Sequence, residues 1–462
     1  MRSSLSRSPP RRPRSTTKPA TSASFPFGPQ IAPSRDDNPG TGIVSTDNDD
    51  SCDVALLPAA TLLLPYFEVD TRNLQEENTL FAITNVTPED RIARITLWTD
   101  YAYPVLTFNV FLTGYDVQSI SVGDLLRGVL PSNGTSVSTR GLRSEMSSAL
   151  DLAHCGRLGG TLDSGAVATI VKAFTEGTGN AVGPLTSCEA IGNVHDNAIG
   201  YATIDVVRNC AANDPTSAAY WTTDIAYDNV LIGDYQQLSA SQQFAQSSAM
   251  VHIRAIPEGG TSAARQSDAK YATRFPRTFY SRYQSSLTPK LDGRQPLPSS
   301  FAVHWIQGGA AEYQTNLKTW REGKPGEVQL CTMQASNVTK VAEIVRFDEA
   351  ENAVGEVPTS RICAPLVTDI TLPATSRVGV ADASVFPQLT NGATSGWVYL
   401  NLDNCTCDTP VGSSNWIVSS MRAQGRYSVD MDGAALANGC SPQTPISEVT
   451  SGMEVIGPYV KP

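Results

Sequence analysis

The sequence predicts a mainly β protein: two sandwich-like domains with a small helical insertion and a disordered N-terminal tail. Three observations lead to this fold class. Only 17% of the residues are charged, below the ~25% of typical soluble domains. Glycine (35) and proline (30) are abundant, and apolar residues alternate with polar ones in short runs. This combination favours many short strands joined by turns over long surface helices.

Residues 79–120 are the clearest β segment. The runs "TLFAITN", "RIARITLW", "VLTFNVFLTG" and "YDVQSISV" follow one another with short turns between them. In the second run, Ala93, Ile95 and Leu97 alternate with other residues, the period-2 pattern of a half-buried strand. Strands at this spacing are typical of a sandwich or barrel.

Residues 54–67, "VALLPAATLLLPYF", form a run without charge. It is shorter than the ~18–20 residues that span a bilayer, and Pro58 and Pro65 would interrupt a helix. The residues before it are acidic, whereas a secretion signal begins with a basic region. We therefore expect a buried strand that opens the folded body, and no transmembrane segment anywhere in the chain.

One helix is predicted in "DSGAVATIVKAFTEG", residues 163–177. Its apolar residues fall at i, i+3, i+4 and i+7: Val167, Ile170, Val171 and Phe174. Asp163 or Ser164 can cap the start, and Gly177 lies where a helix-ending glycine belongs. "RSEMSSALDL" is a second possible helix.

These patterns divide the chain into four parts. They are a basic and polar tail (1–50), a β-sandwich-like domain (51–260) with its helical insertion at about 140–190, a linker (261–300) and a second β-rich domain (301–462). The strands of the second domain are expected in runs such as "FAVHWIQGG", "VAEIVRF", "GWVYLNLD" and "NWIVSSM".

Charge is distributed unevenly along the chain. The net charge is −11, yet residues 1–35 contain seven of the 34 basic residues and no acidic one. The rest of the chain is therefore strongly acidic, which argues against nucleic acid as a partner because phosphates need clustered Lys and Arg. The tail is Arg- and Ser-rich but lacks the apolar stretch of a secretory signal.

The nine cysteines predict disulfides in an exported protein, and the alternative is buried thiols in a cytosolic one. No C-x-x-C pair occurs, so a zinc ribbon or thioredoxin-type site is not supported. The four cysteines of the first predicted domain can all pair, whereas the five of the second leave one unpaired. The candidates are Cys52, Cys155, Cys188, Cys210, Cys331, Cys363, Cys405, Cys407 and Cys440.

Catalytic motifs are missing from the sequence. It contains no G-x-S-x-G, H-E-x-x-H, Walker A or G-x-G-x-x-G pattern. His195 and Asp196 lie together in a loop and form a possible base with its orienting carboxylate. His252 and His304 fall inside predicted strands, where a packing role is favoured.

An acidic stretch, "TTDIAYDNVLIGDYQ", is the remaining candidate for chemistry. Asp224, Asp228 and Asp234 supply oxygen ligands that would suit Ca²⁺. Alternatively, Asp228 and Asp234 flank a glycosidic bond. The favoured interpretation is that these residues form turns, so we expect no metal and no cofactor, with Ca²⁺ as the alternative.

Several phrases resemble a group of uncharacterised bacterial β-rich proteins that are exported. They include "LLLPYFEVD", "LTGYDVQSI", "DNVLIGDYQ", "GWVYLNLDN" and "SMRAQGRYSVDMDGAALANGC". The resemblance covers most of residues 54–440. It implies an extracellular or cell-surface location and carries no catalytic residues.

The first functional hypothesis is a non-enzymatic exported or cell-surface protein with a binding or assembly role. Its expected partner is a carbohydrate or a protein. Trp98, Tyr101 and Tyr103 in "LWTDYAYP" would form an exposed stacking patch for a sugar, with core packing as the alternative.

Two alternatives remain open. One is a carboxylate-dependent hydrolase of glycans that uses Asp228 and Asp234, with Glu68 and Asp70 behind them. The other is a structural subunit of a surface layer or filament, which requires an exposed strand edge or a large apolar patch. The oligomeric state stays open at this point.

Overall fold

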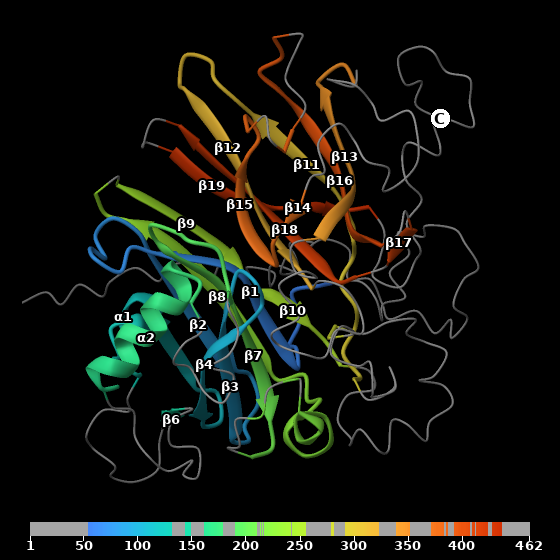
Figure 1. Cartoon of the computed structure of the whole chain (residues 1–462). Coiled ribbons are helices and arrows are strands. Elements are labelled where there is room, and N and C mark those ends of the chain that lie inside the picture. The colour runs from blue at the N-terminus through green and yellow to red at the C-terminus, as the bar shows by residue number, and fades with distance from the viewer. Residues whose placement is uncertain are drawn as a thin grey trace, which may run out of the picture.

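The computed structural model confirms the mainly β fold (Figure 1). It describes residues 54–131, 144–148, 161–178, 190–209, 213, 215, 217–241, 243–255, 279–280, 292–322, 339–351, 371–382, 385–386, 392–406, 409–411, 413–423 and 427–436. The predicted tail lies outside these residues. So do all the cysteines except Cys405, which lies in a strand.

The first half of the chain forms two antiparallel sheets. The larger has the order β10 (Val251–Ile253), β1 (Thr61–Val69), β7 (Ala198–Val207), β3 (Arg91–Thr99), β4 (Pro104–Leu112), β6 (Ser144–Ser148). The smaller has the order β5 (Val117–Ser121), β2 (Asn78–Asn85), β8 (Leu231–Ser239), β9 (Phe244–Ala249). Contacts of β1 with β2 and β8 pack the two sheets together, as in a sandwich.

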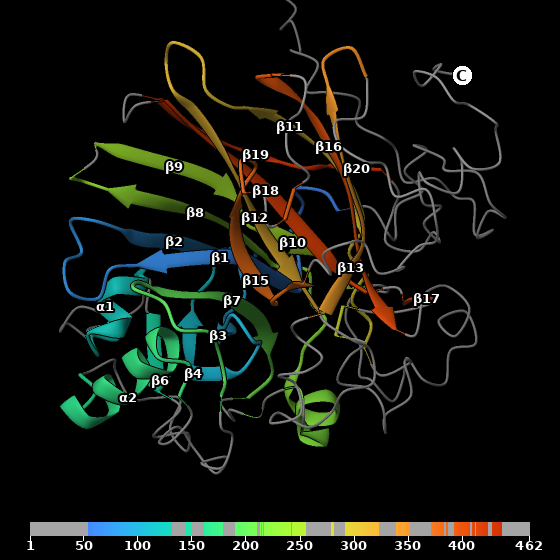
Figure 2. The same cartoon turned by 45° about the horizontal axis from the view of Figure 1, so that its top comes forward.

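The second half repeats this arrangement of a larger and a smaller sheet. The larger has the order β14 (Thr371–Leu372), β13 (Thr339–Asp348), β16 (Ser395–Thr406), β11 (Ser300–Ile306), β20 (Ala434–Ala435), with β17 (Thr409–Val411) beside β16. The smaller has the order β15 (Thr375–Gly379), β12 (Tyr313–Arg321), β18 (Asn415–Ala423), β19 (Tyr427–Asp432). Figures 1 and 2 both show this smaller sheet next to β1 and β9.

Strand β1 is buried along its whole length. It contacts β2 and β8 of its own half as well as β12 and β15 of the other half. The predicted strand is therefore confirmed, although it starts at Thr61 and extends to Val69. Pro65 is tolerated because the pairing of β1 with β7 is irregular between Leu64 and Phe67, so the missing N–H breaks no regular ladder.

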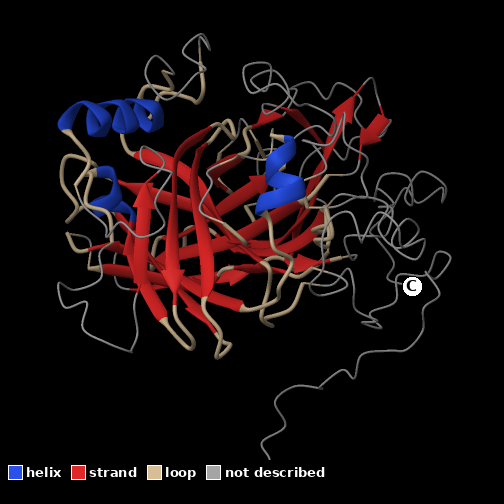
Figure 3. Cartoon of the chain, turned by 90° about the horizontal axis from the view of Figure 1, so that it is seen from below, coloured by secondary structure: helices blue, strands red, loops and turns tan. Residues whose placement is uncertain are grey.

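Two α-helices, α1 (Val122–Leu126) and α2 (Ser164–Thr175), and a π-helix, η1 (Tyr220–Asp224), lie outside the sheets (Figure 3). The prediction of α2 is confirmed. The Asp163 carboxylate caps it by accepting hydrogen bonds from the amides of Gly165 and Ala166 at 2.9 and 3.0 Å. Gly177 follows with φ +62°, which a residue with a side chain rarely adopts.

The second possible helix, in "RSEMSSALDL", is wrong. Residues 144–148 form β6, which pairs with the outer edge of β4. Serine is a weak helix former because its hydroxyl competes for backbone groups. In β6 the backbone N–H and C=O groups of the segment hydrogen-bond to β4, whereas a short helix would have to pair them within itself.

The predicted linker ends inside the core. Arg294, Gln295, Leu297 and Ser299 are fully buried, and residue 294 forms an isolated bridge with Ala255. One continuous cluster of buried apolar residues spans both halves. The two halves therefore pack as one body instead of hanging on an exposed connection.

No helix within the described ranges has the length and apolar character needed to cross a membrane.

Gly200 of β7 offers a test of how closely the core is packed. A Cβ atom there would lie 2.2 Å from the carbonyl oxygen of Trp98 and 2.7 Å from Cζ of Phe67. We expect Gly200→Ala to lower the free energy of unfolding by about 1–3 kcal/mol, because overpacking forces neighbours to shift. Urea unfolding followed by fluorescence measures the change.

Gly379→Ala is the matched control. A Cβ atom at this strand position has its nearest neighbour, Oδ1 of Asn316, at 3.5 Å, an ordinary contact. Equal stability of the two variants would contradict the close packing around Gly200.

Candidate functional site

Two glutamates lie where the two halves meet. Glu68 is in β1 and Glu77 directly precedes β2, and their side chains are only 6% and 9% exposed. The Glu68 carboxylate accepts hydrogen bonds from the hydroxyl of Tyr66 (2.7 Å) and from Nδ2 of Asn197 (2.9 Å). Arg377 of β15 forms an ion pair with it at 2.9 Å. The second half thus neutralises a buried charge of the first.

Glu77 is held less tightly. Among the described residues its ion-pair partner is Arg422, with Nη2 at 3.7 Å from Oε1. Burial, followed by repulsion from Glu68, raises the pKa of Glu77 to about 7, while Arg422, Arg377 and Lys318 oppose the shift. The carboxyl group of Glu77 therefore changes charge near neutral pH.

Three cations of the second half face these carboxylates: Lys318, Arg377 and Arg422. Lys318 of β12 is buried, and its Nζ donates to Oε1 of Gln246 in β9 at 3.2 Å. The guanidinium of Arg422 in β18 lies 4.0 Å from the ring centroid of Phe244, also in β9. We call Tyr66, Glu68, Glu77, Lys318, Arg377 and Arg422 the junction cluster.

The junction cluster reaches the surface at one side. The side chain of Arg377 is 32% exposed and that of Arg422 is 21% exposed, while both carboxylates lie deeper. A carboxyl group with a pKa near neutral beside a second carboxylate suits proton transfer. Complementary charges on two packed surfaces equally suit a contact that holds the halves together.

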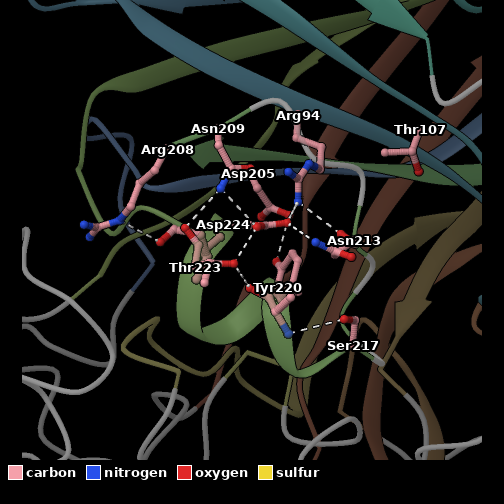
Figure 4. Close-up of polar contacts among 12 residues, drawn as sticks. Arg94, Thr107, Asp205, Arg208, Asn209, Asn213, Ser217, Tyr220, Thr223 and Asp224 are labelled. Atoms are coloured by element: carbon pink, nitrogen blue, oxygen red, sulfur yellow. Dashed lines mark hydrogen bonds and ion pairs between the residues drawn. The ribbon is translucent and has the colours of Figure 1, made fainter. Parts of the chain in front are cut away.

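A second polar network surrounds η1 (Figure 4). Nη1 of Arg94, in β3, lies 3.1 Å from Oδ2 of Asp224, and both side chains are 1% exposed. Asn213 donates to the same oxygen at 2.8 Å, and Thr223 donates to the other at 2.8 Å. Burial acts to raise the pKa of Asp224, but these hydrogen bonds and the Arg94 charge lower it.

Asp205 and Arg294 complete this network. Asp205 of β7 accepts hydrogen bonds from Thr61 (2.7 Å), from the hydroxyl of Tyr220 (2.9 Å) and from Nη1 of Arg294 (2.8 Å). Nε of Arg294 donates to Asp292 at 2.8 Å. Burial alone would lower the pKa of Arg294, yet Asp292, Tyr220 and Asp205 together raise it above its ordinary value. Thr61, Asp205, Tyr220, Asp292 and Arg294 are all buried. They join β1, β7, η1 and the segment of residues 292–299 that leads into β11.

The sequence-based candidates of the acidic stretch do not come together. Asp224 is held by Arg94, whereas Asp228 is half-buried and Asp234 is exposed in β8. No group of three or more His, Cys, Asp or Glu in the described part of the chain is placed to hold a metal ion. Asp70 accepts hydrogen bonds from the amides of Arg72 and Asn73 and so shapes the turn after β1.

The expected pair of His195 and Asp196 is wrong. Nε2 of His195 lies 3.0 Å from Oδ2 of Asp100, whereas Asp196 is exposed. Asp196 lies in a bend, and the buried Asp100 is the carboxylate that lies beside His195 instead. His252 is buried, as predicted, and its Nδ1 lies 2.8 Å from the carbonyl oxygen of Leu57.

His304 departs from the packing role predicted for it. It lies on the exposed side of β11, with Nε2 3.2 Å from Oε1 of Glu349. The alternation of β11 explains this, because Val303 and Trp305 on either side point into the core.

The proposed aromatic patch is also wrong. Trp98 and Tyr103 are buried, at 1% and 3% exposure. Trp98 stacks on Tyr201 with ring centroids 5.8 Å apart, and its indole N–H donates to Thr203 at 2.9 Å. Tyr101 is half-buried and donates to Asn193 at 2.7 Å. Trp98 and Tyr103 therefore belong to the apolar core instead of an exposed patch.

Several residues of these sites have no recognisable motif in the sequence. Glu77, Lys318, Arg377 and Arg422 come from four separate elements, and their spacing in the chain follows no pattern. The one local signal is a charged residue inside a run in which apolar and polar residues alternate, such as Lys318 in "TNLKTW". That signal marks burial of a charge and leaves its partner unidentified.

Comparison with known proteins gives no match: no family model fits the sequence, and no curated protein or solved structure is significantly similar to it.

The buried network predicts that replacing Arg294 strongly destabilises the fold. Replacing it by leucine leaves Asp205 and Asp292 without their cation in a solvent-free site. We expect Arg294→Leu to lower the free energy of unfolding by about 3–5 kcal/mol, measured by thermal or urea unfolding.

Arg72→Leu is the control for this substitution. Arg72 pairs with Asp70 at 3.4 Å, but its side chain is 70% exposed, so the loss should stay below about 1 kcal/mol. Similar losses in both variants would show that the Arg294 network contributes no more than a surface pair.

Proposed function

We propose that this protein is a non-enzymatic, exported or cell-surface protein that binds a protein partner or assembles through a strand edge. The observation that carries the proposal is β5, the edge strand of the smaller sheet in the first half. Its outer side has no neighbouring strand in that sheet among the described residues.

The composition of β5 supports a role in pairing. Its sequence, "VQSIS", has no charge and no proline, the devices by which natural proteins protect exposed edges. Val117 is 56% exposed, and Tyr115, just before the strand, is 64% exposed. An open edge with apolar side chains can accept a further strand from another protein or another copy.

A protein partner is favoured over a carbohydrate. The aromatic residues expected to stack on a sugar, Trp98 and Tyr103, lie in the core. Export is supported by the resemblance to exported bacterial proteins and by the acidic body of the chain. The packing of both halves as one body suits a rigid scaffold that presents its edges.

The edge is tested by Val117→Lys. A lysine on an edge strand opposes pairing by placing a charge where a second strand would lie. We expect association in solution, measured by light scattering over a concentration series, and retention of the full chain at the cell surface to fall about tenfold or more, with no change in melting temperature.

Val194→Lys is the matched control, because Val194 is 80% exposed in a loop that is not part of the β5 sheet. It should behave as the wild type. The role of the edge would be refuted if the wild-type chain stays monomeric and if Val117→Lys is retained at the cell surface to the same extent as the wild type. Recovery of the chain in the cytosolic fraction alone would refute export.

A second candidate function is a carboxylate-dependent hydrolase acting on glycans, and one observation favours it. The pKa of Glu77 is raised to about 7 beside Glu68, which suits a general acid that protonates a leaving-group oxygen. Glu68, oriented by Tyr66 and Arg377, would then act as base or nucleophile.

This candidate predicts that Glu77→Gln and Glu68→Gln each lose at least about 100-fold of the release of reducing ends from a panel of polysaccharides. Glu76→Gln, an exposed neighbour, should keep full activity. Absence of wild-type activity over the whole panel, or unchanged activity in Glu77→Gln, would exclude the hydrolase.

A further inference from the structure

We propose that the side chains of Lys318 and Gln246 react with each other to form an internal isopeptide bond that joins the two halves covalently. Lys318 belongs to β12 of the second half, and Gln246 belongs to β9 of the first. Strand β9 lies beside β19 of the second half (Figure 2). The inference goes beyond the binding role of β5 and does not depend on it.

The two reacting groups are already in contact. Nζ of Lys318 donates to Oε1 of Gln246 at 3.2 Å. Because Oε1 is one C=O bond away from the amide carbon Cδ, Nζ lies at most about 4.4 Å from Cδ. Attack on a carbonyl carbon starts from a separation of about 3–3.5 Å. The amine therefore needs only a small movement, from the amide oxygen to the face of the carbon.

Both side chains are shielded from water. Lys318 is 1% exposed and Gln246 is 3% exposed. Burial disfavours the charged form of an amine and so favours the neutral form, which is the nucleophile. Exclusion of water also protects the reacting amide from hydrolysis. The pair is thus placed in the kind of environment in which an amine attacks an amide.

The sheet adds a second reason for a neutral amine. Lys318 lies directly opposite Arg377 in the register of β12 and β15, and like charges in this position repel. Glu68 and Glu77 attract the charged form, but Glu68 is already paired with Arg377 at 2.9 Å. The neutral amine is needed only transiently, because an amide bond is stable at neutral pH once the leaving group has gone.

Ser420 orients the amide for the reaction. Nε2 of Gln246 donates to Oγ of Ser420, in β18, at 2.5 Å. Val418 lies opposite Lys318 in the register of β12 and β18, so Ser420, two residues further on, shares its face of the sheet. Lysine can only donate, so it meets the amide oxygen, while Nε2 is held on Ser420. The amide nitrogen is therefore the group set to leave.

The bond change balances without another reagent. The lone pair of the neutral Nζ attacks Cδ, the Cδ–Nε2 bond breaks, and one proton from Nζ leaves with Nε2 as ammonia. Nothing is oxidised or reduced. Glu77 suits the transfer of this proton, because its pKa is raised to about 7 and Lys318 is one of the cations that act on it. The product is a secondary amide between β9 and β12.

The mass of the full chain tests the proposal. After reduction and alkylation, most wild-type molecules should be lighter by one ammonia than the sequence between their observed termini requires. Tryptic digestion should give a branched peptide that contains both Lys318 and Gln246, with no cleavage after Lys318. Lys318→Arg has no nucleophilic amine and should restore the full mass. Lys172→Arg, the same change at an exposed position of α2, should keep the loss.

Three results would overturn the proposal. They are a wild-type chain of full mass, a loss of ammonia that maps to other residues, and a loss that persists in Lys318→Arg. If Lys318→Arg does not fold, the wild-type digest decides alone, because peptides in which Lys318 and Gln246 are both unmodified would exclude the bond.

Discussion

The structure depends on the burial of β1 on both faces. One face packs on the smaller sheet of its own half, and the other receives β12 and β15 of the second half. A strand with two buried faces must be apolar almost throughout, and β1 is "TLLLPYFEV". Its exceptions are informative. Thr61 and Glu68 sit near its two ends, and each is a node of one polar network.

Pro65 makes β1 an attachment point as well as a core strand. Its irregular pairing with β7 leaves a carbonyl that faces the second half. The hydroxyl of Thr375, the first residue of β15, donates to that carbonyl at 2.8 Å. The same region holds Tyr66 and Glu68, so a backbone hydrogen bond and an ion pair fix the same two strands. The interface is thereby specified by directional contacts, and apolar packing supplies most of its stability.

Strands β2 and β4 were predictable because one face of each is more buried than the other. Strand β3 was expected to be half-buried, but it is buried on both faces from Ala93 to Thr99. The α2 helix was predictable because cap, periodicity and terminal glycine agree. Strands such as β12 and β15 were missed, since "YQTNLKTWR" and "TSRVG" place polar residues at buried positions. Lys318 and Thr375 are buried against the other half of the chain, where they bond Gln246 and Pro65, and local patterning does not reveal this. The same reason hid the junction cluster, whose members are distant in sequence.

The buried position of Arg294 has a consequence for how the molecule is made. The first half, ending at β10, contains Asp205 and Tyr220 but lacks the cation that neutralises Asp205 in the native core. That cation arrives only when synthesis passes residue 294, within the segment that leads into β11. A fragment cut between the halves would retain a buried carboxylate without its counter-charge. A cut at the apparent boundary therefore removes a counter-charge from the core of the first sandwich as well as its partner.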